Sequence, residues 1–462
     1  MNINYFNWKR VGKRYLLTND FGFYSYISPD TFQNLIRKQE VANDTERDDL
    51  LEKGFVFTGN TEQFIQAFSP YLSSMKSFII HGPTLHIFVV TTACNGDCVY
   101  CQAKSDQTVK RIQMARETAE KAVRIALQSP AERLSFEFQG GEPLMNFDCI
   151  RHIIEFTEQI NDEKEVSFNL VSNLTLLTDE ILEFLQAHHV NISTSLDGPE
   201  WLHNCNRPYF GGRGMYADAV KKMQLLTAKE ILFGAIQTTT RKSLSAAKEI
   251  VREYQCQGLH SIFLRPLTPL GMASVRRSEI GYTPQEFVRF YRECLLEIIQ
   301  LNREGYEMRE GHAAIFLKKI LLQYSENYME LRSPCGGGVG QIAYYPDGSI
   351  YTCDEGRMLA EMGNTAFRMG SVEDDYRTLL QSTACGVICK ESVIEAQPSC
   401  SQCVYQPYCG VCPVVRYAAH EEPGEFSPQD YRCAIHSGIL DTLFDLLQDQ
   451  ANEKLFRTWI EY

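Results

Sequence analysis

Three cysteines on one short stretch of the chain have the spacing of a metal site. Cys94, Cys98 and Cys101 form a C-x3-C-x2-C pattern directly after the apolar run of residues 85–90. Three thiolates on a tight loop can bind three irons of a [4Fe–4S] cube and leave the fourth iron open to another ligand. A partial zinc site or three reduced structural cysteines would use the same residue type, so the spacing alone leaves these alternatives open.

The cysteines are concentrated again towards the end of the chain. None of the 16 precedes Cys94, and eight lie from Cys353 to Cys433. The first ten residues lack the apolar core of a secretory signal, so we expect a cytoplasmic protein. In that compartment many cysteines indicate metal or redox chemistry and not a disulfide framework. On spacing alone, the C-x2-C pairs at 400–403 and 409–412 suit zinc as well as iron.

Composition argues against two classes of partner. The net charge of −13 disfavours nucleic acid, because a polyanion would be repelled. No stretch approaches the roughly 18 apolar residues that a membrane span requires, so we expect no membrane partner. The length of 462 residues is enough for about three domains.

Residues 1–80 are predicted to form a small α/β unit. The β-rich runs 15–18 and 23–27 flank a turn, which predicts a hairpin, and helices follow at about 28–37 and 45–53 before a last strand at 55–57. This pattern is similar to the winged-helix-like recognition domain at the front of many peptide-modifying enzymes, which binds a leader peptide as an added strand. A unit that only packs on the next domain would give the same pattern.

Residues 81–305 alternate strand and helix. We expect six parallel strands with helices outside them, which makes an α/β fold with a partial (β/α)6 barrel. The strands are predicted at residues 85–90, 134–138, 166–171, 190–194, 231–236 and 261–264. Residues 306–434 are predicted to form a cysteine-rich domain of long loops with a hairpin at 344–352, and residues 435–462 a C-terminal helix.

Polar and glycine-rich residues follow the predicted barrel strands. Chemistry collects at the C-terminal ends of strands in such folds. The three cysteines follow the first strand, and other polar groups follow later ones: Gln139 to Pro143, Ser172 and Asn173, Ser195 to Gly198, and Arg265 with Pro266.

The cysteine loop and this rim resemble the radical S-adenosylmethionine (SAM) superfamily. The match is the C-x3-C-x2-C loop with Tyr100 before its last cysteine, together with Gly-Gly-Glu-Pro at residues 140–143. The resemblance implies a SAM-binding [4Fe–4S] cluster at the loop and a 5′-deoxyadenosyl radical as the cofactor product. It places the SAM ammonium on Gly140, Gly141 and Glu142, and the SAM carboxylate on Arg207. It gives further cofactor contacts to Tyr100, Ser172, Asn173, Ser195 and Asp197, for which hydrogen bonding within loops and caps is the alternative.

The later cysteines resemble the SPASM extension of peptide-modifying radical SAM enzymes. The resemblance implies two auxiliary [4Fe–4S] clusters, one on Cys400, Cys403, Cys409 and Cys433 and the other on Cys335, Cys353 and Cys412. The chain departs from the pattern because two residues, and not the usual three, separate Cys409 from Cys412, and because no cysteine lies shortly before Cys335. The fourth position of that second site is therefore open to substrate, or is filled by Cys389 or Cys385. We expect the four cysteines near the barrel elements to be packing thiols: Cys149, Cys205, Cys256 and Cys294.

Over almost its whole length the chain resembles the radical SAM maturases of His-Xaa-Ser systems, and it is similar to the enzymes that crosslink darobactin-type peptides. The resemblance is carried by residues 16–19, 85–90, 136–144, 193–199, 262–267 and 354–363. It implies that the protein installs a carbon–carbon or ether crosslink in a ribosomally made precursor, with flavodoxin or ferredoxin as electron donor. Asp354 matches the position of a proposed catalytic base in sulfatase-maturing relatives. Formylglycine formation in a sulfatase and a zinc-stabilised binding scaffold are the alternative functions.

Overall fold

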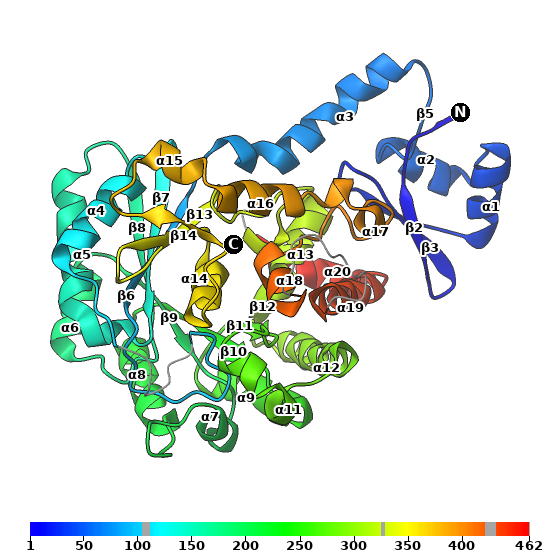
Figure 1. Ribbon diagram of the computed structural model, residues 1–462. Coiled ribbons are helices and arrows are strands. Elements are labelled where there is room, and N and C mark those ends of the chain that lie inside the picture. Colours follow the sequence, from blue (N-terminus) through cyan, green and yellow to red (C-terminus); the bar gives the residue numbers. More distant parts are fainter. Residues whose placement is uncertain (104–110, 325–328, 421–430, 462) are drawn as a thin grey trace.

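The N-terminal unit is built on a three-stranded antiparallel sheet, as seen in a computed structural model that describes residues 1–103, 111–324, 329–420 and 431–461 (Figure 1). The strands run in the order β2 (Asn7–Val11), β3 (Arg14–Thr18), β4 (Tyr24–Ile27), and β1 (Asn2–Ile3) pairs separately with β5 (Val56–Phe57). The predicted hairpin is β3–β4, and the predicted helices are α1 (Pro29–Lys38) and α2 (Asp44–Glu52). Helix α1 begins where expected because the Ser28 side chain accepts a hydrogen bond from Thr31 N and Pro29 occupies its first turn.

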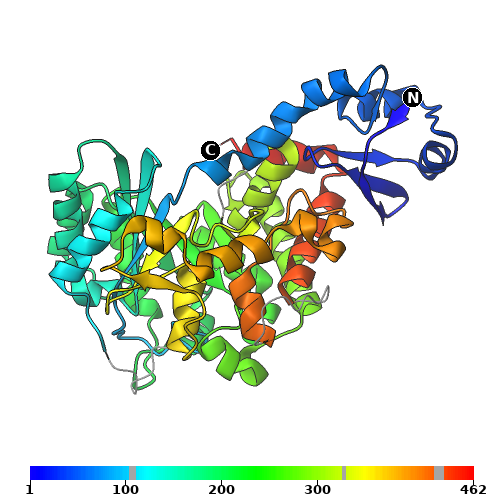
Figure 2. The same ribbon diagram turned by 45° about the horizontal axis from the view of Figure 1, so that its top comes forward.

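A long helix that was not predicted from the sequence links this unit to the rest of the chain. Helix α3 (Thr61–Lys76) extends from the N-terminal unit and is followed by the short η1 (Ser77–Ile80). The N-terminal unit lies at one end of the molecule and the outer helices of the barrel at the other, as Figures 1 and 2 show. The unit also packs on the C-terminal region: Thr18 Oγ1 donates to Val404 O at 2.7 Å, Tyr26 Oη donates to Phe444 O at 2.5 Å, and Lys9 pairs with Asp441 at 2.6 Å.

A ten-stranded sheet forms the centre of the molecule. Its order is β12-β11-β10-β9-β8-β7-β6-β13-β14-β15. The six strands from β6 to β11 are parallel to one another, as predicted: β6 (Leu85–Thr91), β7 (Arg133–Gly140), β8 (Glu165–Val171), β9 (Asn191–Ser195), β10 (Phe233–Thr238) and β11 (Ser261–Arg265).

The predicted hairpin at 344–352 extends the barrel sheet. Its strands are β13 (Gln341–Tyr344) and β14 (Ser349–Tyr351), and Gly348 adopts the positive φ of +86° that the turn requires. Strand β13 lies parallel to β6, with Gln341 opposite Leu85, while β15 (Arg368–Ser371) pairs with β14 and β12 (Arg309–Glu310) pairs with β11. The segment predicted as the cluster domain therefore contributes strands to both edges of the sheet.

Helices cover the outer face of the sheet, and the opposite face is polar on β7 and β8 but apolar on β6. On β7, Leu134, Phe136 and Phe138 are buried in the main apolar core, whereas Glu137 and Gln139 point to the other side and stay partly accessible. The helices between and after the barrel strands are α4 (Arg116–Ala126), α5 (Phe147–Ile160), α6 (Asp179–Ala187), α7 (Glu200–Asn206), α8 (Tyr216–Ala228), α9 (Ala247–Cys256), α10 (Met272–Val275), α11 (Arg277–Ile280) and α12 (Pro284–Arg303).

The C-terminal region contains more helix than the sequence indicated. Its helices are α13 (Gly311–Leu322), α14 (Asp354–Glu361), α15 (Tyr376–Leu380), α16 (Thr383–Glu391), α17 (Pro398–Ser401), α18 (Pro413–His420), α19 (Tyr431–Leu446) and α20 (Gln450–Thr458). The single C-terminal helix expected over 435–462 is thus two helices, because Asp449 caps a new helix through a bond from Ala451 N. Helix α19 packs against α12. Within the described part of the chain, no helix is both long and apolar enough to cross a membrane.

Candidate functional site

The loop after β6 brings the sulfurs of Cys94, Cys98 and Cys101 near one another. Burial raises the pKa of the Cys98 thiol to about 11, with Arg207 lowering it and the Cys101 thiol contributing to the rise. Burial also raises the pKa of Cys94, with additional contributions from both other thiols. The loop is fixed by backbone hydrogen bonds, among them the bond from Val99 N to Asn206 O at 2.9 Å. The three predicted ligands therefore share one loop, in which each cysteine is partly exposed.

The end of β7 approaches this loop so closely that a side chain would not fit. Gly141 N donates to Thr91 O at 2.9 Å, and Glu142 N donates to Ala93 O at 2.8 Å. A Cβ atom on Gly141 would lie 2.3 Å from Ala93 O, and one on Gly140 would lie 2.5 Å from Thr91 O. The two glycines are thus required by backbone contact, and not by an unusual φ.

Glu142 is a buried carboxylate that is held by the two residues after β8. Ser172 Oγ donates to its Oε1 at 2.6 Å, and Asn173 N donates to its Oε2 at 2.8 Å. Burial raises the pKa of Glu142, and these hydrogen bonds oppose that shift. Asn173 also donates through Nδ2 to Asn95 Oδ1 at 2.9 Å, so the same residue connects Glu142 to the cysteine loop.

Tyr100, Asp197 and Arg207 form a second buried group beside the loop. Tyr100 Oη donates to Asp197 Oδ2 at 2.7 Å, and Arg207 Nη1 donates to Tyr100 Oη at 2.8 Å. Burial raises the pKa of Asp197, and the nearby Arg207 lowers it. Ser195, the last residue of β9, lies on the same rim. The rim thus holds carboxylates and a guanidinium around the three thiols.

The later cysteines gather into the two predicted groups. Burial raises the pKa of Cys409 to about 12, and the thiols of Cys433, Cys403 and Cys400 contribute to this rise, so these four lie together. For Cys353, burial, Glu355, and the thiols of Cys412 and Cys335 raise the pKa, which places these three in a second group.

The second group has two candidates for a fourth ligand. The Arg332 guanidinium lies near the thiols of both Cys335 and Cys389, which raise its pKa against the effect of burial. Cys385 instead donates its thiol to Leu379 O at 3.7 Å. Of the two candidates, Cys389 therefore shares a charged neighbour with the group.

A cavity of about 460 Å³ lies against the face of β6, β7 and β8 that the outer helices do not cover, and β6 contributes the apolar Leu85 and Ile87 to it. Its charged and polar lining includes Glu137, Gln139, Arg265, Asp354 and Glu355. Asp354 Oδ1 accepts from Arg357 Nε at 2.7 Å, and Arg357 Nη2 donates to Gln139 Oε1 at 3.0 Å. The cavity thus joins Asp354 to the strand end that carries the glycines.

Comparison with known proteins decides the family. The model of the radical SAM superfamily matches residues 88–235. An uncharacterized protein of Methanocaldococcus jannaschii is 30% identical over 287 residues, which cover 62% of this chain and 90% of that protein. The chain belongs to the radical SAM superfamily.

Two further relatives of this radical SAM enzyme have named activities. A cysteine-type anaerobic sulfatase-maturating enzyme of Clostridium perfringens is 23% identical over 389 residues, which cover 80% of this chain and 99% of that protein. The radical SAM cyclopropyl synthase TigE of Paramaledivibacter caminithermalis is 24% identical over 368 residues, or 74% of this chain and 70% of that protein.

Solved structures share the fold of the radical SAM enzyme. The structure of anSMEcpe with bound AdoMet superposes with a TM-score of 0.68 at 19% identity, covering 82% of this chain and 100% of that one. Streptococcus suis SuiB bound to precursor peptide SuiA superposes with a TM-score of 0.57 at 15% identity, covering 94% and 99%. The α/β barrel core predicted from the sequence is thereby confirmed.

The residues around the cysteine loop fit the cofactors of this superfamily, a [4Fe–4S] cluster and SAM. Three thiols on one loop leave one position of a cube for a further ligand. SAM carries an ammonium, a carboxylate and a sulfonium, and the rim offers Glu142, Asp197 and Arg207 as charges of the opposite signs. No three Cys, His, Asp or Glu side chains among the described residues are arranged as ligands of a single metal ion.

Several charged residues of the site were given no role by the sequence, although Glu137 and Arg357 lie within segments that carry the resemblance. Glu137 and Arg357 line or support the cavity, and Arg332 lies between two cysteines. The alternation Ser135, Glu137, Gln139 along β7 was a usable signal, because side chains two apart on a strand share a face. Of the four expected packing thiols, Cys149 and Cys294 are buried, but Cys205 and Cys256 are exposed, so the prediction is wrong for these two.

Substituting Gly141 by alanine is expected to disorder the cysteine loop. The new methyl group would meet the Ala93 carbonyl at 2.3 Å, so the backbone must move, at a cost of about 1–3 kcal/mol. We expect a lower melting temperature and a lower iron content. The Gly386→Ala variant is the control, because a Cβ there would meet nothing within 4 Å. Equal iron contents in the two variants would contradict this role of Gly141.

Proposed function

We propose that this radical SAM enzyme installs a carbon–carbon or ether crosslink in a ribosomally synthesised precursor peptide. The observation that carries the proposal is the N-terminal sheet, whose outer strands β2 and β4 pair with no further strand among the described residues. An extended peptide can add to such an edge through main-chain hydrogen bonds. SuiB, which superposes over 94% of this chain, was solved with a precursor peptide.

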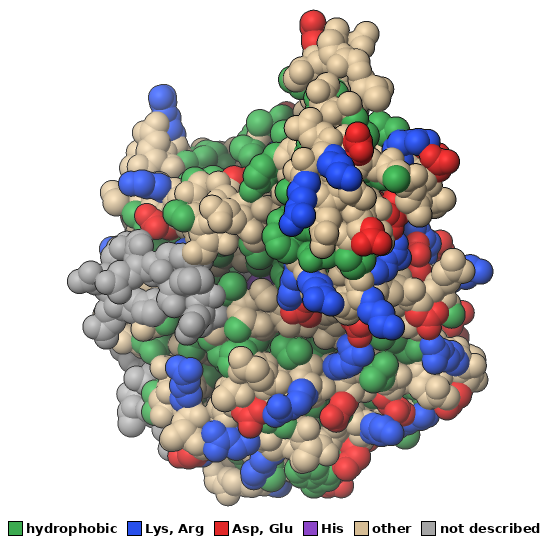
Figure 3. Space-filling view, turned by 90° about the vertical axis from the view of Figure 1, so that its right-hand side faces the viewer, with side chains coloured by type: hydrophobic (Ala, Val, Ile, Leu, Met, Phe, Trp, Pro, Cys, Tyr) green, Lys and Arg blue, Asp and Glu red, His purple; other side chains and the backbone are tan. Residues whose placement is uncertain are grey.

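The exposed side chains of the N-terminal unit suit an uncharged or mixed peptide. Acidic, basic and apolar side chains are interspersed on the face that Figure 3 shows, without a large patch of one charge. Trp8 on β2 is 52% exposed and packs against Phe32 of α1, with ring centroids 4.8 Å apart. The edge strand can form main-chain hydrogen bonds with a leader peptide, and the Trp8 ring can make an apolar contact with it.

In the proposed reaction the cavity of the barrel positions the core of the peptide. When bound, the cluster and SAM supply a 5′-deoxyadenosyl radical that removes a hydrogen atom. Glu142 and Arg207 hold the charged groups of SAM, and Gln139 and Glu137 face the cavity in which the peptide side chains would lie. As the new bond closes, one proton and one electron must leave. We assign the proton to Oδ2 of Asp354, because its Oδ1 is engaged by Arg357. The cysteine groups that would hold the auxiliary clusters would take the electron, and a flavodoxin or ferredoxin would be the electron donor that starts the reaction.

Anaerobic turnover tests the proposal. The reconstituted full chain is incubated with SAM, dithionite and a candidate precursor peptide, chosen by searching the neighbourhood of its gene for a small open reading frame. We expect 5′-deoxyadenosine and a peptide that is lighter by a pair of hydrogen atoms and unreactive to carbonyl reagents. Absence of 5′-deoxyadenosine would overturn the enzymatic proposal, and unmodified peptide despite its formation would overturn the choice of substrate.

Formylglycine formation in a sulfatase is the second candidate. It is favoured by the match to 99% of the Clostridium sulfatase-maturating enzyme. Such an aldehyde product reacts with carbonyl reagents, which a crosslink does not.

Removing residues 1–80 separates the two candidates. If this unit binds the leader, its loss removes one of two linked binding sites, and we expect kcat/KM for the full precursor to fall by about 100-fold or more. Formation of 5′-deoxyadenosine without peptide is the internal control for an intact barrel. Undiminished peptide turnover by the truncated protein would favour the sulfatase-type function.

A further inference from the structure

Cys409 lies beside a buried histidine of α19. His436 Nδ1 is 3.8 Å from the Cys409 sulfur, and the imidazole is only 2% exposed. The ring packs edge-on against Phe316 of α13, with ring centroids 5.8 Å apart. A nitrogen at this distance can contact a sulfur ligand of an iron–sulfur cluster, and such contacts tune its reduction potential.

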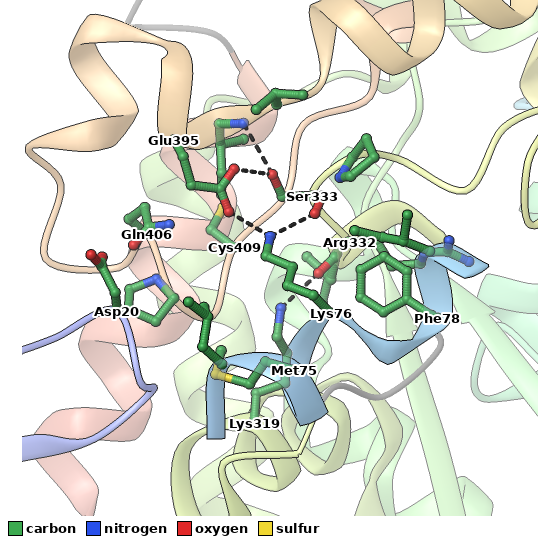
Figure 4. A pocket seen from close by; sticks show the side chains of 17 residues that line it. Asp20, Met75, Lys76, Phe78, Lys319, Arg332, Ser333, Glu395, Gln406 and Cys409 are labelled. Atoms are coloured by element: carbon green, nitrogen blue, oxygen red, sulfur yellow. Dashed lines mark hydrogen bonds and ion pairs between the residues drawn. The ribbon is translucent and has the colours of Figure 1, made fainter. Parts of the chain in front are cut away.

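A buried lysine of the same helix α13 lies next to the Cys409 loop. Lys319 is 5% exposed, and its Nζ donates to Leu331 O at 2.6 Å and to Tyr408 O at 2.8 Å. Both acceptors are neutral carbonyls, and Tyr408 directly precedes Cys409. Lys319 and Cys409 also line one cavity of about 440 Å³, shown in Figure 4. Burial lowers the pKa of Lys319 to about 7, while the Cys409 thiol acts in the opposite direction, because a negative charge there favours the ammonium.

The other charges around this cysteine group largely cancel in pairs. Lys76, in the same cavity, contacts the Glu395 carboxylate at 2.5 Å, as Figure 4 shows. Lys9 and Asp441, which both affect the pKa of Cys403, pair with each other at 2.6 Å. Arg416 adds a further positive charge near Cys400, where it lowers the pKa of the thiol. Asp20 lines the same cavity and offsets one of these cations, so the excess positive charge around Cys409 amounts to that of the Lys319 ammonium.

The second cysteine group has no such excess. Arg332 lies near Cys335, but the Glu355 carboxylate lies near Cys353, where it raises the pKa of the thiol. One cation and one anion thus offset each other. Reduction adds one negative charge to a cluster, so a neighbouring buried cation stabilises the reduced form.

We propose that Lys319 determines which auxiliary cluster is reduced more easily. Its buried positive charge raises the reduction potential of the cluster on Cys400, Cys403, Cys409 and Cys433. That potential then lies above the potential of the cluster on Cys335, Cys353 and Cys412. The electron released when the product bond closes is then found mainly on the first of these clusters. This inference rests on the cluster ligands assigned under the proposed function, but not on the identity of the precursor.

A redox titration monitored by electron paramagnetic resonance tests the role of Lys319. The reconstituted full chain is titrated without peptide, so that failure of the crosslinking proposal leaves the readout intact. In K319M we expect the reduced fraction of one auxiliary cluster at fixed potential to fall at least about tenfold, a shift of about 59 mV to lower potential. In K319R, which keeps the charge, the shift should be largely absent. A C400A/C403A variant identifies the signal of the affected cluster by its loss.

The double variant K76M/E395Q is the matched control, because it removes a cation and an anion from the same cavity together. We expect its potentials to match those of the parent protein. Iron content is measured for every variant, and K319Q replaces K319M if the latter does not retain its clusters. Unchanged potentials in an iron-replete K319M or K319Q protein would overturn the proposal. It would equally be overturned if C400A/C403A kept all the cluster signals.

Discussion

The Cys98→Ala variant is expected to form no 5′-deoxyadenosine above the level of a reaction without enzyme. Cys98 lies partly exposed in the loop between Cys94 and Cys101, and the loop offers three thiols for a cluster that needs all three. Without one of them the cluster on which SAM cleavage depends should not assemble. Iron and sulfide analysis should show a partial loss, because the cysteines of the two auxiliary groups remain.

The control for this loss is a cysteine that belongs to none of the predicted cluster sites, the buried Cys149 of α5. It lies in the main apolar core and away from the loop, so Cys149→Ala removes only packing, at a cost of about 1 kcal/mol. We expect this variant to keep its iron and to cleave SAM at the parental rate. SAM cleavage by Cys98→Ala at a comparable rate would show that the radical SAM cluster is not held by this loop.

The parts of the site that the sequence predicted are those with local signals. Cys94, Cys98 and Cys101 lie within eight residues of one another, and the glycines after β7 form one uninterrupted motif. The six parallel strands were also predictable, since each is a short β-rich run followed by a helical pattern. Such features need no knowledge of which distant segments meet.

The parts that the sequence could not predict depend on distant pairing. Nothing local to Gln341 indicates that it lies opposite Leu85, yet this register places β13 beside β6 and brings α14, with Asp354, to the barrel cavity. Arg357 reads as an ordinary helical arginine, but it is 2% exposed and connects Asp354 to Gln139, 218 residues earlier. From the sequence, Lys319 likewise looks like a lysine on the exposed side of a helix. In the structure its ammonium donates a hydrogen bond to the Tyr408 carbonyl oxygen and is buried. Their roles follow from tertiary contacts alone.

The Asp354→Asn variant is expected to separate SAM cleavage from product formation. Asparagine keeps the size of the side chain and can still accept a hydrogen bond from Arg357, but it cannot take up a proton. General-base catalysis contributes about 10²–10⁴-fold, so we expect the rate of crosslinked product to fall by that factor. Formation of 5′-deoxyadenosine should continue, because Asp354 lies in the barrel cavity and outside the buried rim around the cysteine loop.

Glu361→Gln is the matched control for Asp354. Glu361 pairs with the same Arg357 at 3.4 Å but does not line the cavity, so its loss tests the ion pair without removing the proposed base. Both product and 5′-deoxyadenosine should be measured by mass spectrometry against time. Equal losses in the two variants would mean that Arg357 needs its ion pairs and that Asp354 is not a base. Glu137 of β7 also faces the cavity, and burial raises the pKa of its carboxyl group. If only the Glu137→Gln variant lost product formation, the proton acceptor would be Glu137 and not Asp354.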